Sequence, residues 1–434
     1  MSKTVNIFWF RRDLRLDDNI GFFEALNGKY PVLPIFIFDS EILEELPKND
    51  ARVSFIFETL QNMRKTLQDE NNSSLAMFYG KPVEVYKALI KNYNINTVYT
   101  NHDYEPYAKE RDKEIQSLLE KNDISFKTYK DQVIFEKDEV VKDDGKPYVV
   151  YTPYMKKWKA KFKDYNLKIY YTNSHLDNVI ENTRLPNLSL SDIGFTKSSQ
   201  EVREYSVTPT VIQDYEATRN YPAKDTTSRL GPHLRFGTVS VRKMIKKATA
   251  EKNEIFWQEL IWREFFMQIL WHFPNTHKDA FKAKYDNIKW RNNDKEFKAW
   301  CEGKTGYPLV DAGMRQLNKT GFMHNRVRML VGSFLCKHLL IDWRKGEAYF
   351  AEKLHDYDMA SNVGNWQWVA GSGVDASPYF RIFNPTTQID KFDKDRKYIK
   401  KWVKEFETDK YPDKIVDHKE ARERCLKVYK EAVA

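Results

Sequence analysis

The segment around which the chain is organised is residues 356–388, DYDMASNVGNWQWVAGSGVDASPYFRIFNPTTQ. It combines two carboxylates, an amide, two tryptophans and an arginine in the order Asp356, Asp358, Asn362, Trp366, Trp368 and Arg381. Such a density of polar and aromatic groups between glycines and before Asn384-Pro385 is typical of a binding site. A buried junction whose polar groups satisfy one another would explain any one of these residues but not the whole segment.

The segment lies in a region that carries helical patterns and no strand signals beyond residue 210. Residues 254–271, EIFWQELIWREFFMQILW, are apolar nearly all round, which predicts a helix buried between others. Residues 307–318 and 325–340 repeat helical periodicity, with a break at Gly321. We therefore predict an all-α carboxy-terminal half.

The amino-terminal part alternates strand and helix patterns. Short β-rich runs cover residues 5–10, 32–38, 75–79, 97–100 and 125–129. Helical patterns cover residues 50–67, 82–93 and 105–119. This alternation predicts an α/β domain with a doubly wound, mostly parallel sheet. No GxGxxG follows the first strand, so a dinucleotide fingerprint is absent.

The domain organisation follows from length and pattern. A chain of 434 residues exceeds the size of a single ordinary core, so about two domains are expected. We place the α/β domain at residues 1–130 and the helical domain at residues 205–434. Residues 131–204, where periodicity weakens and turn residues appear, form the predicted linker.

Composition narrows the function. Aromatic residues make up 15% of the chain, which suggests a pocket or surface that stacks flat rings such as flavins or nucleobases. A formal net charge of +9 fits a polyanionic partner if the excess is gathered on one face.

Three widely spaced cysteines, Cys301, Cys336 and Cys425, form no metal-binding pattern and are read as reduced thiols. We predict no metal site. The amino terminus is neither a signal nor a transit peptide, and no run of about 18 apolar residues is present. We therefore expect a cytosolic protein without a membrane partner.

Three further constellations carry chemistry. Hydroxyls and a guanidinium at Thr226–Pro232, TTSRLGP, precede a helical pattern and suit a diphosphate, although such a motif is also an ordinary helix cap. Asn325, Arg328 and Met329 share one helical face, with Arg326 pointing elsewhere. On the buried helix, Glu259 and Trp262 are three apart and can present a carboxylate and an indole to one cavity.

The segment 356–388 resembles the flavin-binding signature of the photolyase and cryptochrome family, in particular the class I photolyases that repair cyclobutane pyrimidine dimers. The run RRDLRLDDN at residues 11–19, TSRL at residues 227–230 and GKPYVVYTPY at residues 145–154 also resemble this family. The resemblance implies that the helical domain binds FAD and that the α/β domain carries an antenna pigment, a folate or a deazaflavin in many members. Candidate antenna contacts are Arg52 and Asn101 to Tyr107, and the match does not choose the pigment.

The resemblance also implies roles for the residues that match. Arg328 pairs with Asp356 beside the flavin ring, Asn362 lies at the flavin N5 edge, and Asp358 lies near the flavin or its ribityl group. The FAD diphosphate is held by an upstream tyrosine and the polar loop, namely Tyr215, Thr227, Ser228, Arg229, Leu230 and Gly231. Asn325 is expected at both the cofactor and the substrate.

On the substrate side, Glu259 hydrogen-bonds the flipped lesion bases, and Trp262 and Trp368 clasp them beside Met329. Arg326, Arg381 and Gln388 follow the DNA backbone, which positions the duplex without reading sequence. An electron-hopping chain from the surface to the photoexcited flavin is formed by Trp290, Trp343 and Trp366.

The sequence therefore predicts a monomeric, light-driven lyase that splits cyclobutane pyrimidine dimers in UV-damaged DNA by electron transfer from excited reduced FAD. A cryptochrome-type blue-light receptor is the first alternative, and Glu259, Trp262, Met329 and Trp368 argue against it. Repair of the (6-4) photoproduct is the second. The segment Met323-His324-Asn325-Arg326 resembles dimer photolyases, yet its one histidine keeps that alternative open.

Overall fold

The structure is a computed structural model that describes residues 3–434. It divides into two compact units. Unit 1 consists of residues 1–136, 164–205 and 230–247, and unit 2 of residues 137–163, 206–229 and 248–434. Each unit is therefore assembled from segments that are distant in sequence. The boundaries expected at residues 130 and 204 stay a prediction.

Unit 1 is built on a five-stranded parallel sheet of order β3-β2-β1-β4-β5. Its strands are β1 (Thr4–Phe10), β2 (Val32–Asp39), β3 (Ala76–Gly80), β4 (Asn94–Asn101) and β5 (Ser125–Tyr129). The strand order reverses between β1 and β4, so the sheet is doubly wound, as the sequence predicts. Ser125–Tyr129 matches the predicted run, and the other strands differ from theirs by at most three residues at either end.

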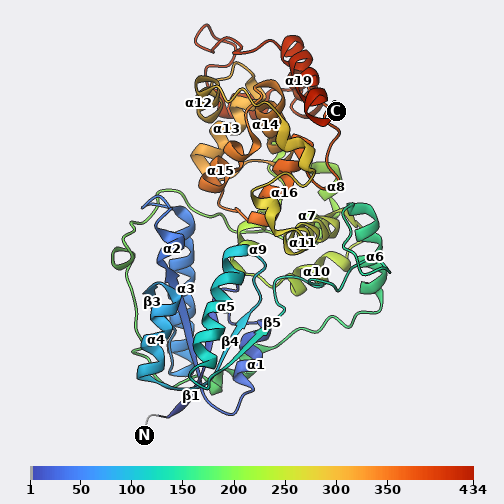
Figure 1. Cartoon of the computed structure of the whole chain (residues 1–434). Coiled ribbons are helices and arrows are strands. Elements are labelled where there is room, and N and C mark those ends of the chain that lie inside the picture. Colours follow the sequence, from blue (N-terminus) through green and yellow to red (C-terminus); the bar gives the residue numbers. More distant parts are fainter. Residues whose placement is uncertain (1–2) are drawn as a thin grey trace. The chain divides into compact units, whose positions relative to one another are not determined.

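Helices cover both faces of this sheet (Figure 1). The helices and 3-10 turns are α1 (Ile20–Leu26), α2 (Ser40–Leu43), α3 (Ala51–Asn71), α4 (Pro82–Asn92), α5 (Pro106–Glu120), η1 (Thr172–Asn178), η2 (Ser191–Ile193), α9 (Gly231–Phe236) and α10 (Val241–Thr249), the last of which runs into unit 2. Phe8 and Phe10 of β1 pack with α1 and α3, whereas Ile7 and Trp9 pack with α4 and α5. Alternating side chains of one strand thus enter two separate cores, as the strand period of two requires.

The arginine-rich run after β1 is a buried ion-pair network. Arg15 Nη2 donates to Asp131 at 2.6 Å, and Arg242 Nη2 donates to the same carboxylate at 2.9 Å. Arg242 Nε also donates to Asp18 at 3.1 Å. Because each buried charge has a partner of opposite sign, this run is part of the architecture of unit 1.

Unit 2 is helical in the residues that the structure describes. Its elements are α6 (Tyr151–Lys163), α7 (Pro209–Gln213), α8 (Tyr215–Thr218), η3 (Pro222–Lys224), α11 (Ile255–His272), η4 (Pro274–His277), η5 (Ala283–Asn287), α12 (Asp294–Glu302), α13 (Pro308–Thr320), α14 (Asn325–Ser333), the π-helical turn η6 (Phe334–His338), α15 (Trp343–Lys353), α16 (Met359–Ala370), α17 (Pro385–Phe392), α18 (Lys397–Trp402) and α19 (His418–Val433). The fold class predicted from sequence is confirmed in both parts.

Two details of unit 2 differ from the sequence prediction. Helix α6 was not predicted, although its buried residues Tyr151, Tyr154 and Trp158 follow helical spacing. The helix expected at 325–340 is α14 followed by the π turn η6, and Leu340 with φ of 49° ends the run. A π turn widens the helix locally, which periodicity alone does not reveal.

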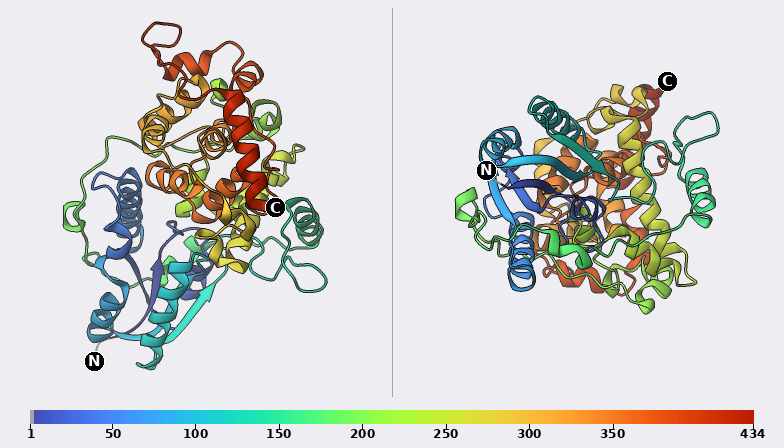
Figure 2. Two further views of the ribbon diagram at one scale, coloured as in Figure 1. Left: turned by 45° about the horizontal axis from the view of Figure 1, so that its top comes forward. Right: turned by 90° about the horizontal axis from the view of Figure 1, so that it is seen from below.

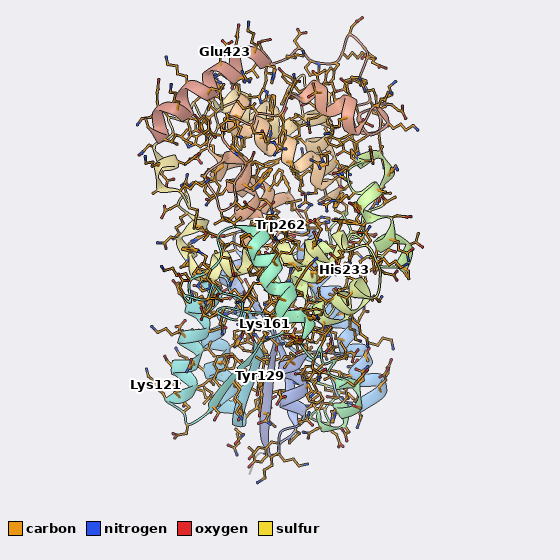
Figure 3. All side chains as sticks on the ribbon, turned by 90° about the vertical axis from the view of Figure 1, so that its right-hand side faces the viewer. Lys121, Tyr129, Lys161, His233, Trp262 and Glu423 are labelled. Atoms are coloured by element: carbon orange, nitrogen blue, oxygen red, sulfur yellow. The ribbon has the colours of Figure 1, made fainter. Side chains whose placement is uncertain are left out.

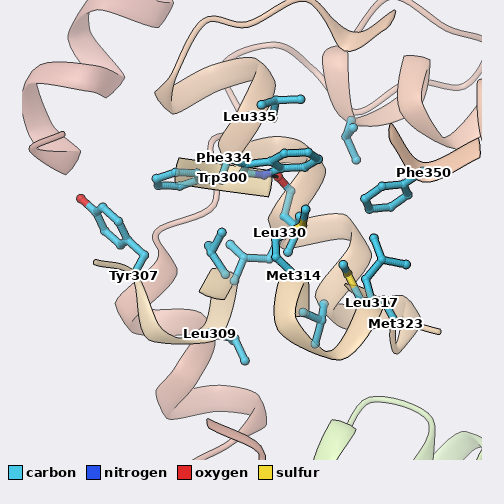
Figure 4. Packing of buried hydrophobic residues seen from close by; sticks show 14 of the residues in the cluster. Trp300, Tyr307, Leu309, Met314, Leu317, Met323, Leu330, Phe334, Leu335 and Phe350 are labelled. Atoms are coloured by element: carbon cyan, nitrogen blue, oxygen red, sulfur yellow. Dashed lines mark hydrogen bonds between the residues drawn. The ribbon is translucent and has the colours of Figure 1, made fainter. Parts of the chain in front are cut away.

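The main core of unit 2 packs α12 to α16 around residues such as Trp300, Leu330 and Phe334 (Figure 4). Helix α19, the red helix at the carboxy terminus in Figure 2, packs against η5 and η6. Asn362 and Trp366 of α16 are buried. Among residues 3–434, no helix is long and apolar enough to cross a membrane.

Candidate functional site

The predicted pair of Arg328 and Asp356 is present in unit 2. Arg328 Nη1 and Nη2 donate to the two carboxylate oxygens of Asp356 at 3.1 and 2.8 Å, and Arg328 Nε donates to the Met323 carbonyl at 2.7 Å. This fork geometry fixes the guanidinium plane. The two side chains are 24% and 16% exposed, so the pair lies at the edge of the core.

The polar loop 225–229 lies beside this pair. The guanidinium of Arg229 stacks on the ring of Phe322 with its central carbon 3.4 Å from the ring centroid, and Arg328 lies 5.7 Å from the same centroid. Arg229 also pairs with Asp225 and adopts a left-handed φ of 58°. Phe322 therefore brings the predicted diphosphate loop and the Arg328–Asp356 pair together.

His324, the N-cap of α14, lies close to the positive charges of this region. Burial, and then the charges of Arg229, Arg328 and Arg326, lower the pKa of the His324 imidazole to about 4. His324 Nδ1 accepts a hydrogen bond from the Arg326 backbone N–H at 3.2 Å, which requires an unprotonated nitrogen. Asp225 and Asp356 pair with two of these three guanidiniums, so the region around the neutral imidazole keeps a net positive charge of the kind that attracts phosphate.

The other members of the predicted diphosphate set are near in sequence. Thr227 and Ser228 are half-buried in the loop before α9, and the Ser228 carbonyl accepts from the Ser206 N–H at 2.8 Å. Leu230 and Gly231 form the N-cap and first residue of α9 and belong to unit 1.

Asn362 lies on α16 and is held by a residue of α15. Its Nδ2 donates to the carboxylate of Glu347 at 2.9 Å and to the Glu347 carbonyl at 3.2 Å. Burial raises the pKa of the Glu347 carboxyl, whereas hydrogen bonds from Asn362 and Tyr357 lower it. Glu347 thus fixes which way the amide faces. Asp358 is the N-cap of α16 and accepts from the Ser361 N–H at 3.1 Å.

The three tryptophans of the predicted electron chain belong to one core. Trp343 begins α15 and Trp366 lies on α16, and both are buried, whereas Trp290 packs at the edge. The Trp366 ring lies so close to Gly346 that a methyl group on residue 346 would overlap it. Helix α15 therefore approaches α16 closely, one turn away from Trp343.

Trp300 is an additional neighbour of Trp366 that sequence reasoning did not single out. The two ring centroids are 6.2 Å apart at an interplanar angle of 66°. Trp300 is fully buried, and its indole N–H donates to the Val331 carbonyl at 3.2 Å.

On α11, Glu259 is paired with an arginine that was not predicted. Arg219 Nη1 donates to Glu259 Oε1 at 2.6 Å, and its guanidinium lies 5.1 Å from the ring centroid of Tyr215. Burial and then the charge of Glu259 raise the pKa of the Tyr215 phenol to about 12. Tyr215, at the start of α8, therefore lies near Arg219 and Glu259.

Arg326, on the first turn of α14, contacts Asn220 and Met329. Arg326 Nη2 donates to Asn220 Oδ1 at 2.5 Å, and Arg326 Nη1 lies 3.7 Å from Met329 Sδ. Met329 therefore neighbours Arg326, three residues before it, and the predicted grouping of Met329 with Asn325 and Arg328 stays a prediction. Asn325 is exposed at the first position of α14.

The guanidiniums of Arg219, Arg326 and Arg381 lie near one another. Burial and then the charges of Arg219 and Arg381 lower the pKa of Arg326. Within residues 3–434, neither Arg326 nor Arg381 has a carboxylate partner. Arg381 is exposed, and its carbonyl accepts from the buried amine of Lys337 at 2.9 Å. Half-exposed Gln388 lies on α17. Such a cluster suits a row of phosphates.

Trp262 and Trp368 are both half-buried. Trp262 stacks face to face on Tyr151 of α6, and Figure 3 shows Trp262 near the end of the helix that carries Lys161. Trp368 packs at the edge of the main core of unit 2.

Unit 1 contains a cavity of about 160 Å³ at the carboxyl ends of β1, β2 and β4. It lies at the point where the strand order reverses, which is where such sheets bind ligands. Asp39, Asp103, Glu105 and Tyr107 line it, and the Tyr107 hydroxyl donates to Asp39 at 2.6 Å.

Two of the predicted antenna contacts are engaged elsewhere. The guanidinium of Arg52 pairs with Asp50 at 2.6 Å, and the amide of Asn101 donates to Asp13 at 2.5 Å and Asn19 at 2.8 Å. Local pairing thus uses these two polar groups within the fold of unit 1.

Sequence reasoning missed five residues that hold the predicted ones in place, namely Tyr151, Arg219, Asn220, Phe322 and Glu347. Tyr151 lies in GKPYVVYTPY, and Arg219 and Asn220 follow Tyr215 by one helical turn, so proximity in sequence was a usable signal for these three. Glu347 offered none, because its partner is 15 residues away on another helix.

Comparison with known proteins identifies the family to which the chain is similar. Residues 6–172 match the model of the DNA photolyase family, and residues 256–409 match the FAD binding domain of DNA photolyase. A deoxyribodipyrimidine photo-lyase of Halobacterium salinarum is 34% identical over 99% of both chains.

Two solved structures are also similar. A bacterial class III photolyase from Agrobacterium tumefaciens is 34% identical, with a TM-score of 0.87 over 100% of this chain and 98% of that one. An archaeal photolyase from Sulfolobus tokodaii with two FAD molecules is 34% identical, with a TM-score of 0.83 over 98% and 99%. The finer placement beside class I photolyases stays a prediction. The chain belongs to the photolyase/cryptochrome family and carries its FAD-binding domain.

Proposed function

We propose that this protein is a light-driven DNA lyase that splits cyclobutane pyrimidine dimers. The observation that carries the proposal is that α16 packs against both α11 and α14. Arg328 and Asn362, expected at the flavin, and Glu259 and Trp262, expected at the lesion, are therefore on neighbouring helices (Figure 1), and Asp356 lies in the turn before α16. Relatives over nearly the whole chain are named deoxyribodipyrimidine photo-lyases.

The donor set fits FAD. The electropositive loop side with Arg229 and the Thr227 hydroxyl suits a diphosphate. Arg328, held by Asp356, offers a fixed guanidinium edge to a flat ring, and Asn362, oriented by Glu347, offers an amide. FAD, when bound, reduced and excited by light, supplies the electron that opens the dimer.

The chain's own residues would do the positioning. Arg326 and Arg381 would hold phosphates on both sides of the lesion, which fixes the duplex without reading its sequence. A dimer that has left the stack would pack on Trp262 and Trp368, and Glu259 would hydrogen-bond its polar edge. Arg219 keeps the Glu259 side chain in place, and a carboxylate oxygen can accept such a bond.

Trp290, Trp343 and Trp366 would serve a separate task, which is to deliver electrons from the surface to oxidised FAD. Trp366 lies on the same helix as Asn362, one turn further on, so it is the proposed first donor. The buried neighbour Trp300 is part of the same aromatic core.

A second chromophore is proposed in unit 1. The cavity at the carboxyl ends of β1, β2 and β4 is lined by apolar side chains such as Trp9 and Phe38 and by charged ones such as Arg12 and Glu105. Such a pocket suits a flat ring with polar edges. Its chemical identity is open between a folate, a deazaflavin and a second flavin. The monomeric state and cytosolic location stay predictions.

The test is photorepair of a defined thymine dimer in an oligonucleotide. Protein loaded with reduced FAD is expected to restore the two thymines under blue light and not in the dark. A protein that binds FAD but leaves the dimer intact in blue light would favour the photoreceptor alternative. The same assay with a (6-4) photoproduct as substrate tests the second alternative, which is repair of that lesion.

A further inference from the structure

Tyr151, in the segment expected to be linker, stacks on Trp262 of the proposed lesion site. It is the first residue of α6 and is 6% exposed. Its ring lies parallel to that of Trp262, with 3.6 Å between the centroids and an interplanar angle of 9°.

The ring of Tyr151 is fixed at both ends. Its hydroxyl donates to the Gln258 carbonyl at 2.8 Å, one residue before Glu259 on α11. Its backbone N–H donates to Asp375 Oδ2 at 3.2 Å, and Asp375 lies in the loop that leads to Arg381. Tyr151 therefore ties α6 both to the helix that carries Glu259 and to the segment before the proposed phosphate contact.

This arrangement restricts Trp262. Tyr151 covers one face of the indole, and Phe265 and Phe266 approach it with centroids at 5.7 and 5.5 Å. The indole is held in one orientation before any ligand arrives. A side chain ordered in advance loses less conformational entropy when it binds, which increases affinity without adding a contact.

We propose that Tyr151 is a positioning residue for lesion recognition, because it stacks behind Trp262 and presents the indole to the flipped pyrimidines. The inference rests on the proposed function, in which Trp262 contacts the dimer. Tyr151 itself touches neither the proposed lesion nor the proposed flavin edge. The segment 145–154 thereby contributes to specificity rather than only connecting two units.

The test compares four variants: Tyr151→Leu, Tyr151→Phe, Trp262→Ala and the double variant Tyr151→Leu/Trp262→Ala. The measured quantity is the ratio of affinities for an oligonucleotide with one thymine dimer and for the same oligonucleotide undamaged. Loss of an aromatic stack is expected to lower this ratio roughly threefold to tenfold in Tyr151→Leu. Tyr151→Phe keeps the stack and is expected to stay within about twofold of wild type.

The double variant decides the mechanism. If Tyr151 acts through Trp262, the double variant has the same ratio as Trp262→Ala alone. FAD content and photoreduction serve as fold controls and are expected to be unchanged in all four. Should Tyr151→Leu not bind FAD, Tyr151→Met replaces it, since a flexible thioether fills the space without a planar face.

Three results would overturn the inference, and each has a different meaning. A wild-type ratio in Tyr151→Leu together with a lowered ratio in Trp262→Ala rejects the positioning role and leaves the proposed function standing. A wild-type ratio in Trp262→Ala rejects the lesion role of Trp262 itself. Losses in the two single variants that simply add in the double variant would show that Tyr151 acts independently of the indole, against the proposal.

Discussion

Replacement of Asp356 by asparagine tests the proposed flavin edge most directly. Asp356→Asn keeps the shape of the side chain, but one of its two oxygens becomes an amide group that faces an N–H of Arg328. Of the two bonds at 3.1 and 2.8 Å, one is lost and the other loses its ionic character.

The magnitude follows from burial. Breaking a fully buried ion pair costs about 3 to 5 kcal/mol, and a hydrogen bond to a charged group is worth about 1.5 to 3 kcal/mol. Arg328 is 24% exposed and Asp356 is 16% exposed, so water replaces part of the loss. We expect the free energy of unfolding to fall by about 2 kcal/mol. If the same orientation of Arg328 is needed for FAD, affinity falls roughly 30-fold.

The assay is FAD binding to apoprotein, followed by flavin fluorescence, together with denaturant unfolding. A matched control is Glu296→Gln, because Arg291 forms the same fork with Glu296 at 2.9 and 2.8 Å, and their exposures are 32% and 14%. The control is expected to lose similar stability and to keep its FAD affinity. Equal FAD affinity in Asp356→Asn, Glu296→Gln and wild type would refute the flavin role of the pair and leave it structural.

Four other substitutions test the remaining proposals. Glu259→Ala is expected to keep FAD and to bind damaged DNA but to repair fewer dimers per absorbed photon. Arg381→Ala is expected to weaken binding to all DNA and to reduce the slope of log affinity against log salt concentration by about one. The same defect in both variants would contradict the division into lesion contacts and backbone contacts. Trp366→Phe is expected to lose most photoreduction by an external reductant, and, once chemically reduced, to repair dimers at near wild-type yield; normal photoreduction would remove Trp366 from the electron chain. His324→Asn tests the pH dependence of stability. The pKa of His324 is depressed to about 4 in the folded state, so the unfolded state binds more protons between about pH 6.5 and 4. The free energy of unfolding of the wild type therefore falls by up to about 3 kcal/mol as pH falls through this window. Asparagine can cap α14 without titrating, so denaturant unfolding of the variant should show a smaller loss, and equal losses would show that His324 does not titrate as described.

Local sequence determined much of the fold because its signals are local. The strand pattern of residues 125–129 and the all-round apolar run of residues 254–271 reflect side chains that alternate across a sheet or surround a buried helix. Helix α6 was missed because lysines between Tyr151, Tyr154 and Trp158 weaken its apolar stripe, and because the stripe packs on α11, more than 90 residues away in the chain.

The sequence by itself determined the residue types available for flavin and lesion, since Arg328, Asp356, Asn362 and Glu259 can be read from their motifs. Only the tertiary structure decided how these groups are held: Glu347 orients Asn362, Arg219 pairs with Glu259, and Tyr151 covers Trp262. The physical reason is range. Spacing along one helix shows which residues share a face, whereas the partner across a helix interface is chosen by packing between segments that no local pattern links.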